Sequence, residues 1–216
     1  MELGAIFTTA FVVGFSGAMM PGPLLTVAIG EATRRGFVAG PLLVLGHAIL
    51  EILLVVFLVL GLAAYLVADQ VHSIIALVGG IFLIYLGWTM YRDAVKGKIS
   101  LRLDEQKEDI TRNAGMHPIL AGILISLSNP YWSLWWATVG LAYITTSMTH
   151  GTAGLAAFLC GHLMADLVWY GAVAAAVDGG RRFMSQRAYK GIIIVCGVFL
   201  IGLGGYFSYH GLHKFL

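Results

Sequence analysis

Six long runs of apolar residues dominate this sequence and limit what it can fold into. They cover roughly residues 5–29, 37–68, 72–91, 117–147, 151–177 and 190–210. Each run is long enough, at 1.5 Å per residue, to cross about 30 Å of hydrocarbon as a helix. The chain is 59 % hydrophobic and 11 % charged, with a mean hydropathy of +0.86, whereas soluble domains carry about 25 % charged residues. The sequence therefore predicts an all-α integral membrane protein with six transmembrane helices.

The basic residues indicate which side of the membrane each loop occupies. With six spans, the three loops on one side carry twelve of the 13 Lys and Arg residues, and the other side has only Lys214. Lys and Arg accumulate in the cytoplasmic loops of membrane proteins. We therefore expect a protein of the cytoplasmic membrane with both termini extracytoplasmic. No basic residue precedes the first apolar run, so we interpret that run as a span and not as a cleaved signal peptide.

The chain divides into two similar halves, residues 1–92 and 117–216, which are joined by a polar linker at 93–116. This linker mixes charges of both signs without aromatic residues, so we expect it to be solvated and cytoplasmic. Three motifs occur in the same order in both halves: Met20-Pro21 and Asn129-Pro130, Gly46-His47-x-x-x-Glu51 and Gly161-His162-x-x-x-Asp166, and the glycine-flanked segments 80–87 and 197–204. Such ordered matches indicate an internal repeat of three spans each.

An odd number of spans in each half has a consequence for the symmetry of the fold. Consecutive halves of three spans must enter the membrane in opposite senses, so we expect two inverted three-helix repeats. Inverted repeats with broken helices in equivalent positions are an architecture of secondary transporters, with the binding site near the membrane midplane.

Two acidic residues, Glu51 and Asp166, are the only charged residues placed deep inside the expected spans. A charged side chain at a helix centre costs roughly 2.5–3.5 kcal/mol and commonly marks an ion, proton or substrate path. His47 precedes Glu51 by four residues, and His162 precedes Asp166 by the same spacing, so each pair shares a helix face. Each pair could relay a proton or could simply fix helix packing. The repetition of the pair in both halves favours the proton role.

Proline motifs interrupt the first and fourth spans. The candidate site residues at these breaks are Pro21, Gly22 and Pro23 in the first span, and Ser126, Ser128, Asn129, Pro130 and Trp132 in the fourth. Proline removes a backbone donor, and freed backbone groups are tolerated in a membrane only inside protein or beside a wet cavity. A half-helix that begins after either break would direct the positive end of its dipole at the midplane, where it suits a carboxylate.

Several of these features occur together in one known family. Pro21-Gly22-Pro23, the stretch GFVAGPLLVLG at residues 36–46, Asn129-Pro130 and the layout of three plus three spans resemble the LysE/RhtB family of amino-acid exporters. The resemblance implies secondary efflux of amino acids from the cytoplasm, driven by ion or proton exchange. Many members continue Asn-Pro with Lys, whereas this chain has Tyr131, and this departure leaves the substrate open.

We therefore expect a proton-coupled exporter of a small solute, with an amino acid as the favoured substrate and no cofactor. A divalent-metal exporter, with the two His-acid pairs as ligands, is the main alternative. A passive channel is less favoured, because the buried acids are paired with histidines.

Other classes of function fit the sequence poorly. An enzyme is not expected, because there is no His-Glu-x-x-His motif, and because Met20 and Asn129 stand where membrane thiol-disulfide carriers place a reactive cysteine. A net charge of +2 is too small for a nucleic-acid role. The expected partners are the substrate, protons and the lipid bilayer, and a homo-oligomer is compatible with the sequence.

Overall fold

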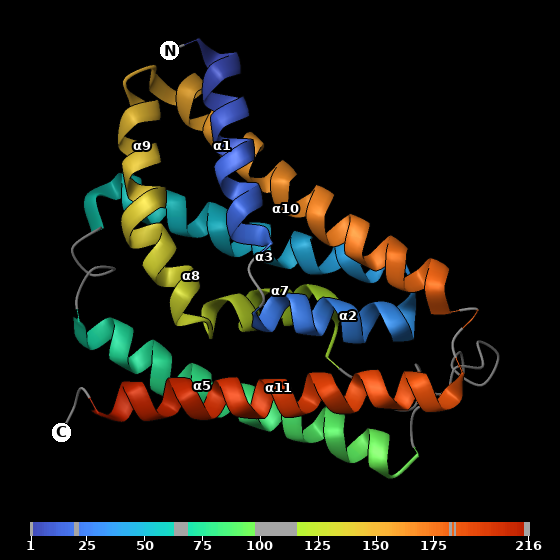
Figure 1. Cartoon of the computed structure of the whole chain (residues 1–216). Helices are drawn as coiled ribbons and strands as arrows, with labels where there is room; N and C mark the ends of the chain where they lie inside the picture. The colour runs from blue at the N-terminus through green and yellow to red at the C-terminus, as the bar shows by residue number, and fades with distance from the viewer. Residues whose placement is uncertain are drawn as a thin grey trace.

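All regular structure is helical in the part of the chain that the computed structural model describes, residues 2–19, 22–62, 69–97, 116–181, 183 and 185–213 (Figure 1). The first half contains α1 (Leu3–Ala18), α2 (Pro23–Arg35), α3 (Ala39–Phe57), the π-helical turn η1 (Leu58–Leu62) and α5 (Asp69–Val95). The second half contains α7 (Pro118–Leu127), α8 (Pro130–Trp135), the π-helical turn η2 (Trp136–Gly140), α9 (Leu141–Met148), α10 (Gly151–Arg181) and α11 (Gln186–His213). The candidate site residue Pro21 and most of the expected linker, residues 98–115, lie outside the described residues.

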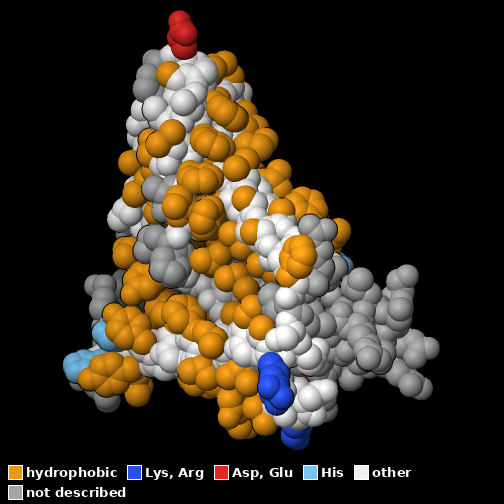
Figure 2. Space-filling view, turned by 45° about the vertical axis from the view of Figure 1, so that its right-hand side comes forward, with side chains coloured by type: hydrophobic (Ala, Val, Ile, Leu, Met, Phe, Trp, Pro, Cys, Tyr) orange, Lys and Arg blue, Asp and Glu red, His pale blue; other side chains and the backbone are white. Residues whose placement is uncertain are grey.

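Four of these helical segments are long and apolar enough to cross a membrane: Ala39–Gly61, Ser73–Val95, Gly151–Gly180 and Gln186–His213. They overlap the expected second, third, fifth and sixth spans, and the expected second span extends beyond the described residues at 63–68. The two remaining apolar runs are divided into shorter helices, α1 and α2 in the first and α7, α8, η2 and α9 in the fourth. Hydrophobic side chains cover most of the face shown in Figure 2, and the few charged side chains visible there lie at its ends.

Both interrupted runs have a residue with extended backbone directly before a proline that begins the next helix. Gly22 has an extended backbone, with φ −161° and ψ −173°, and Pro23 is the first residue of α2. Asn129 is also extended, with φ −101° and ψ 105°, and Pro130 is the first residue of α8. Proline is well tolerated at this position, because the first amides of a helix have no intrahelical partner. At the second break the side-chain Oδ1 of Asn129 accepts a hydrogen bond from the Tyr131 amide at 3.1 Å, which caps the new helix.

The helices pack mainly as three pairs, α1 with α10, α3 with α7, and α5 with α11. In Figure 1 the α5/α11 pair lies along one side of the molecule, and α1 and α9 extend away from it. The half-helix α2 contacts α10, α11 and α3, while α7 contacts α3 and α5. The short helices α2 and α7, one at each break, are therefore packed against the longer helices.

Glycines allow the paired helices to approach until their backbones touch. Gly80 faces Gly204, and Gly87 faces Gly197, across the α5/α11 contact. A Cβ added to any of these four glycines would lie 2.5 to 2.7 Å from the carbonyl oxygen of its partner. Small residues at interfaces are the usual means of close helix packing in membranes, where lipid tails remove the hydrophobic driving force between helices.

We expect a methyl group at Gly204 to destabilise the protein by forcing α5 and α11 apart. Overpacking of this kind costs about 1–3 kcal/mol. Gly202 is the matched control on the same helix, because a Cβ there has nothing within 4 Å. Unfolding of the purified protein in detergent should therefore show a clear loss of stability for Gly204→Ala and no loss of stability for Gly202→Ala. Equal stabilities for the two variants would contradict the close packing of α5 and α11.

Candidate functional site

Four buried ionisable side chains meet where α3 and α10 pack together. His47 and Glu51 lie on α3, and His162 and Asp166 lie on α10. The spacing of four residues places each pair on one helix face, and both faces are turned inward. The exposed fractions are 6 % for His47, 1 % for Glu51, 5 % for His162 and 4 % for Asp166. Charged residues are rarely buried this fully unless they are paired.

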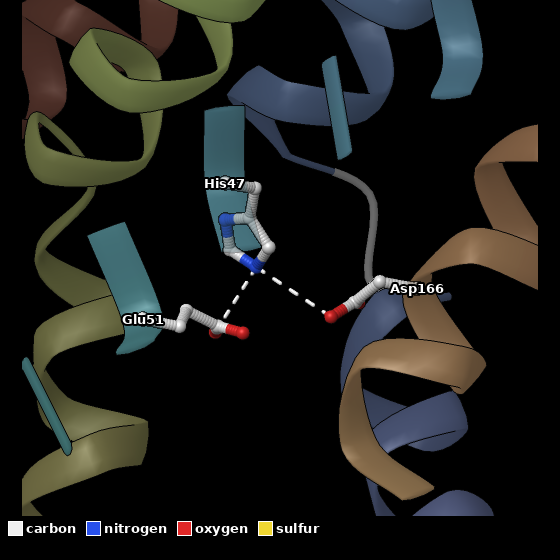
Figure 3. Close-up of side chains that lie close together, drawn as sticks. All are labelled: His47, Glu51 and Asp166. Atoms are coloured by element: carbon white, nitrogen blue, oxygen red, sulfur yellow. Dashed lines mark ion pairs between the residues drawn. The ribbon is translucent and has the colours of Figure 1, made fainter. Parts of the chain in front are cut away.

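Each imidazole contacts both carboxylates, so the two expected pairs form one cluster. Glu51 Oε1 lies 3.0 Å from His47 Nε2 and 3.1 Å from His162 Nε2. Asp166 Oδ2 lies farther from the same two nitrogens, at 3.6 and 3.7 Å. Figure 3 shows His47 between the two carboxylates, with its Nε2 directed at both. We call His47, Glu51, His162 and Asp166 the buried cluster.

Two tryptophans from the helix after the second break also bind Glu51. The indole nitrogens of Trp132 and Trp136 donate hydrogen bonds to Glu51 Oε1 at 3.1 and 2.9 Å. Trp136 is fully buried and begins the π-helical turn η2. The four-residue spacing of the two tryptophans brings both indoles to the same carboxylate oxygen. The half-helix α8 is therefore tied to α3 through a single acidic side chain.

Ser126, in the last turn of α7, connects the first histidine to the second break. Its Oγ lies 2.6 Å from His47 Nδ1, and the side chain is 2 % exposed. When the Ser126 hydroxyl donates to Nδ1, the imidazole proton lies on Nε2, the atom that faces Glu51. Ser126 also holds the imidazole ring in position from the side opposite Glu51.

The buried cluster lies in the wall of a cavity with a volume of about 120 Å³. This is several times the roughly 10–15 Å³ that one water molecule needs on the same measure. Small residues of α1 and the first break, aromatic side chains of α8 and parts of α2, α7, α10 and α11 complete the wall. The lining residues are Gly14, Gly17, Ala18, Gly22, Pro23, Leu24, His47, Glu51, Ser126, Asn129, Tyr131, Trp132, Trp135, His162, Asp166, Tyr170 and Leu203.

Two of the described candidate residues do not line this cavity. The Ser128 hydroxyl donates to the carbonyl of Leu124 at 2.6 Å, one turn back in its own helix. Pro130 is the first residue of α8 and forms part of the helix break. The others, from Gly22 and Pro23 to Ser126, Asn129 and Trp132, border the same space as the buried cluster.

Some atoms of the buried cluster are also arranged so that one cation could lie among them. One ligand atom each from His47, Glu51 and Asp166 lies within 4.8 Å of the other two. Imidazole nitrogen and carboxylate oxygen together suit divalent metals such as zinc or manganese. The geometry therefore accepts a positive charge, whether it is carried by protons, an organic cation or a metal.

Comparison with known proteins identifies the family. The sequence profile described as "LysE type translocator" matches residues 15–211, most of the chain. The chain belongs to the LysE family. No solved structure matches it.

Two relatives align with this LysE-family chain over nearly their full lengths. The "Chemotactic transduction protein ChpE" of Pseudomonas aeruginosa is 31 % identical over 204 residues, which cover 93 % of this chain and 96 % of that protein. The "Putative amino acid efflux protein YcgF" of Bacillus subtilis is 26 % identical over 212 residues, covering 98 % of this chain and 99 % of that protein. Together with its apolar helices, the family membership identifies a multi-pass membrane protein of a transporter family.

Three residues of this LysE-family member that lie near the buried cluster are not among the candidate site residues predicted from the sequence. Trp135 stacks on His162 with ring centroids 4.8 Å apart, and Trp136 meets the same ring edge-on at 5.3 Å. Gly14 of α1 gives His162 room, since a Cβ at this position would lie 2.7 Å from Nδ1. The sequence does contain a signal for Trp136, because its spacing of four residues from Trp132 places the two side chains on one helix face.

We expect Trp136→Phe to destabilise this LysE-family protein, because it removes a buried donor from the carboxylate of Glu51. A hydrogen bond to a charged group contributes about 1.5–3 kcal/mol. Trp88→Phe is the matched control, since Trp88 is 53 % exposed on α5. Unfolding in detergent should give a lower stability for Trp136→Phe than for Trp88→Phe. An equal stability of the two variants would mean that the indole does not support Glu51.

Proposed function

We propose that this LysE-family protein is a secondary transporter that exports an amino acid across the cytoplasmic membrane in exchange for protons. The observation that carries the proposal is the buried cluster, in which ionisable groups from α3 and α10 line a cavity beside two helix breaks. Burying such groups in a membrane protein is costly, and they commonly mark ion, proton and substrate paths. The name of the Bacillus subtilis relative, which refers to amino acid efflux, supports the same substrate class.

We further propose that six spans form two inverted repeats that alternate access to this cavity. The contacts between helices support this arrangement. In two such repeats the first span is equivalent to the fourth, the second to the fifth and the third to the sixth, and this equivalence converts each observed helix pair into another observed pair or into itself. The contact of α1 with α10 then corresponds to that of α7 with α3, and α5 with α11 corresponds to itself. Equivalent glycines support it too, since a Cβ at Gly46 would collide with the carbonyl of Ile119, and one at Gly161 with the carbonyl of Phe7.

The first break supplies groups suited to the carboxylate of an amino acid. α2 begins at Pro23, and Gly22, Pro23 and Leu24 line the cavity. The first amides of a helix and its dipole favour an anion such as a carboxylate. An amino acid could then place its carboxylate near α2 and its ammonium near the buried cluster, while a rocking motion of one repeat against the other exposes the cavity to each side in turn.

One specific observation favours a second candidate, the export of a divalent metal. The ligand atoms of His47, Glu51 and Asp166 lie close enough to share one cation as substrate. Export of Zn²⁺ or Mn²⁺ would use the same cavity and the same acids, so the two candidates differ in the solute that exchanges.

Exchange of labelled solute in proteoliposomes tests the proposal directly. Purified protein, loaded with a pool of unlabelled amino acids and exposed to trace labelled ones without metals, should accumulate at least one label. Glu51→Gln and Asp166→Asn should abolish export driven by a proton gradient while the variants still insert. Full gradient-driven transport by both variants would remove the two acids from the mechanism. No accumulation of any amino acid, together with exchange of Zn²⁺ or Mn²⁺, would replace the first candidate by the second.

We expect the C-terminus to be extracytoplasmic, because the loops rich in Lys and Arg lie on the other side. Alkaline phosphatase fused after Leu216 should be active in cells, and a fluorescent protein fused there should be dark. A fusion after Gly97, near the start of the polar linker, is the control and should give the reverse result. The same outcome at both sites would contradict the proposed topology.

A further inference from the structure

The buried cluster contains polar atoms without a hydrogen-bond partner. Among the described residues, these atoms of the cluster are Glu51 Oε2, Asp166 Oδ2 and His162 Nδ1. All three residues line the same cavity. A buried carboxylate oxygen without a donor is energetically costly. A ligand that fills this cavity is therefore expected to bring hydrogen-bond donors and positive charge.

The two acids are not equally available to such a ligand. Glu51 is fixed, because its Oε1 accepts from Trp132 and Trp136 and lies 3.0 and 3.1 Å from the two imidazole nitrogens. Asp166 Oδ2 is held only loosely, since the same nitrogens lie 3.6 and 3.7 Å away, beyond hydrogen-bond distance. The equivalent positions of the two proposed repeats thus differ: one acid is anchored, and the other is free to take a new donor.

The rest of the lining restricts the ligand further. No Lys or Arg occurs among the lining residues that the structure describes, whereas two acids do. An acidic side chain on the ligand would find no Lys or Arg partner and would be repelled by both carboxylates. The aromatic residues Trp132, Trp135 and Tyr170 border the same space, and aromatic faces attract ammonium groups and apolar side chains.

We infer that Asp166 binds the ammonium group of the transported amino acid, with Glu51 Oε2 as a second acceptor, and that the transported amino acid has no acidic side chain. This inference rests on the proposed transport of amino acids and deepens it. Oε1 of Glu51 keeps both histidines and the indoles in place, and its Oε2 is left to share the ammonium with Asp166. Acidic amino acids, and analogues in which a hydroxyl replaces the ammonium, should bind more weakly to the same arrangement.

Ligand-induced thermal stabilisation of the purified full chain tests this assignment without transport. A ligand that binds the folded state raises the melting temperature according to its affinity. The probes are the neutral and basic amino acids, their 2-hydroxy acid analogues, and aspartate and glutamate. We expect at least one neutral or basic amino acid to stabilise the wild-type protein, and its hydroxy analogue and the acidic amino acids to bind at least tenfold more weakly.

Variants then assign the contact to one carboxylate. Asp166→Asn should weaken binding of the stabilising amino acid at least tenfold, and Asp166→Glu should restore part of the affinity. The control is Glu31→Gln, because Glu31 lies outside the cavity and pairs with Arg34 and Arg35. It should bind as the wild type does. The comparison of amino acid with hydroxy acid needs only the wild-type protein, so the test stands even where a variant does not fold.

The outcomes separate this inference from the transport proposal. If labelled amino acids exchange in proteoliposomes but the hydroxy analogue binds equally well, the ammonium site is wrong and transport stands. If Asp166→Asn keeps the wild-type preference for the amino acid, the contact does not involve Asp166. If no amino acid exchanges or stabilises the protein, both the transport proposal and the ammonium site are overturned.

Discussion

Two carboxylates and two imidazoles lie inside a protein whose outer surface is largely apolar, and the rest of the structure depends on how their charge is neutralised. Buried ionisable groups are tolerated when they are paired and hydrogen-bonded. Here the pairing needs α3 and α10 side by side, because each helix carries one histidine and one acid. It also needs indole donors from α8 and η2 and a hydroxyl from α7. The two parts of the interrupted fourth run are thereby held against α3, on either side of Asn129.

The buried cluster therefore depends on the helix break at Pro130. Without the break, the segment that carries Trp132 and Trp136 would continue the axis of α7. The new helix direction, capped by Asn129, brings both indoles to Glu51 Oε1. The π-helical turn that starts at Trp136 lies directly beside this contact, and such turns are frequent at functional sites. Any motion of α8 would change the number of donors on Glu51, so the position of the half-helix and the electrostatics of the cavity are coupled.

Much of this arrangement follows from local features of the sequence. Hydropathy located the apolar helices, and proline with glycine or asparagine located the breaks, because both signals act on the backbone within one or two turns. The four-residue spacing gave the two His-acid pairs. The joining of the pairs into one cluster depends on contacts between residues about 80 to 110 positions apart, which spacing does not encode. Ser128 illustrates a second limit: a helical serine can face a cavity or bond to the preceding turn, and here it bonds to Leu124.

The contact between α5 and α11 has a further consequence. Gly80 meets Gly204 and Gly87 meets Gly197, and in each case the backbone of one glycine stands against the carbonyl of the other. The contact is reciprocal, as in an isologous interface between two identical subunits. One covalent chain thus contains, at this contact, the geometry of a symmetric dimer. A substitution that adapts one helix to its neighbour would need a matching change in the other, so these two segments are constrained to diverge together even though more than 100 residues of chain separate them.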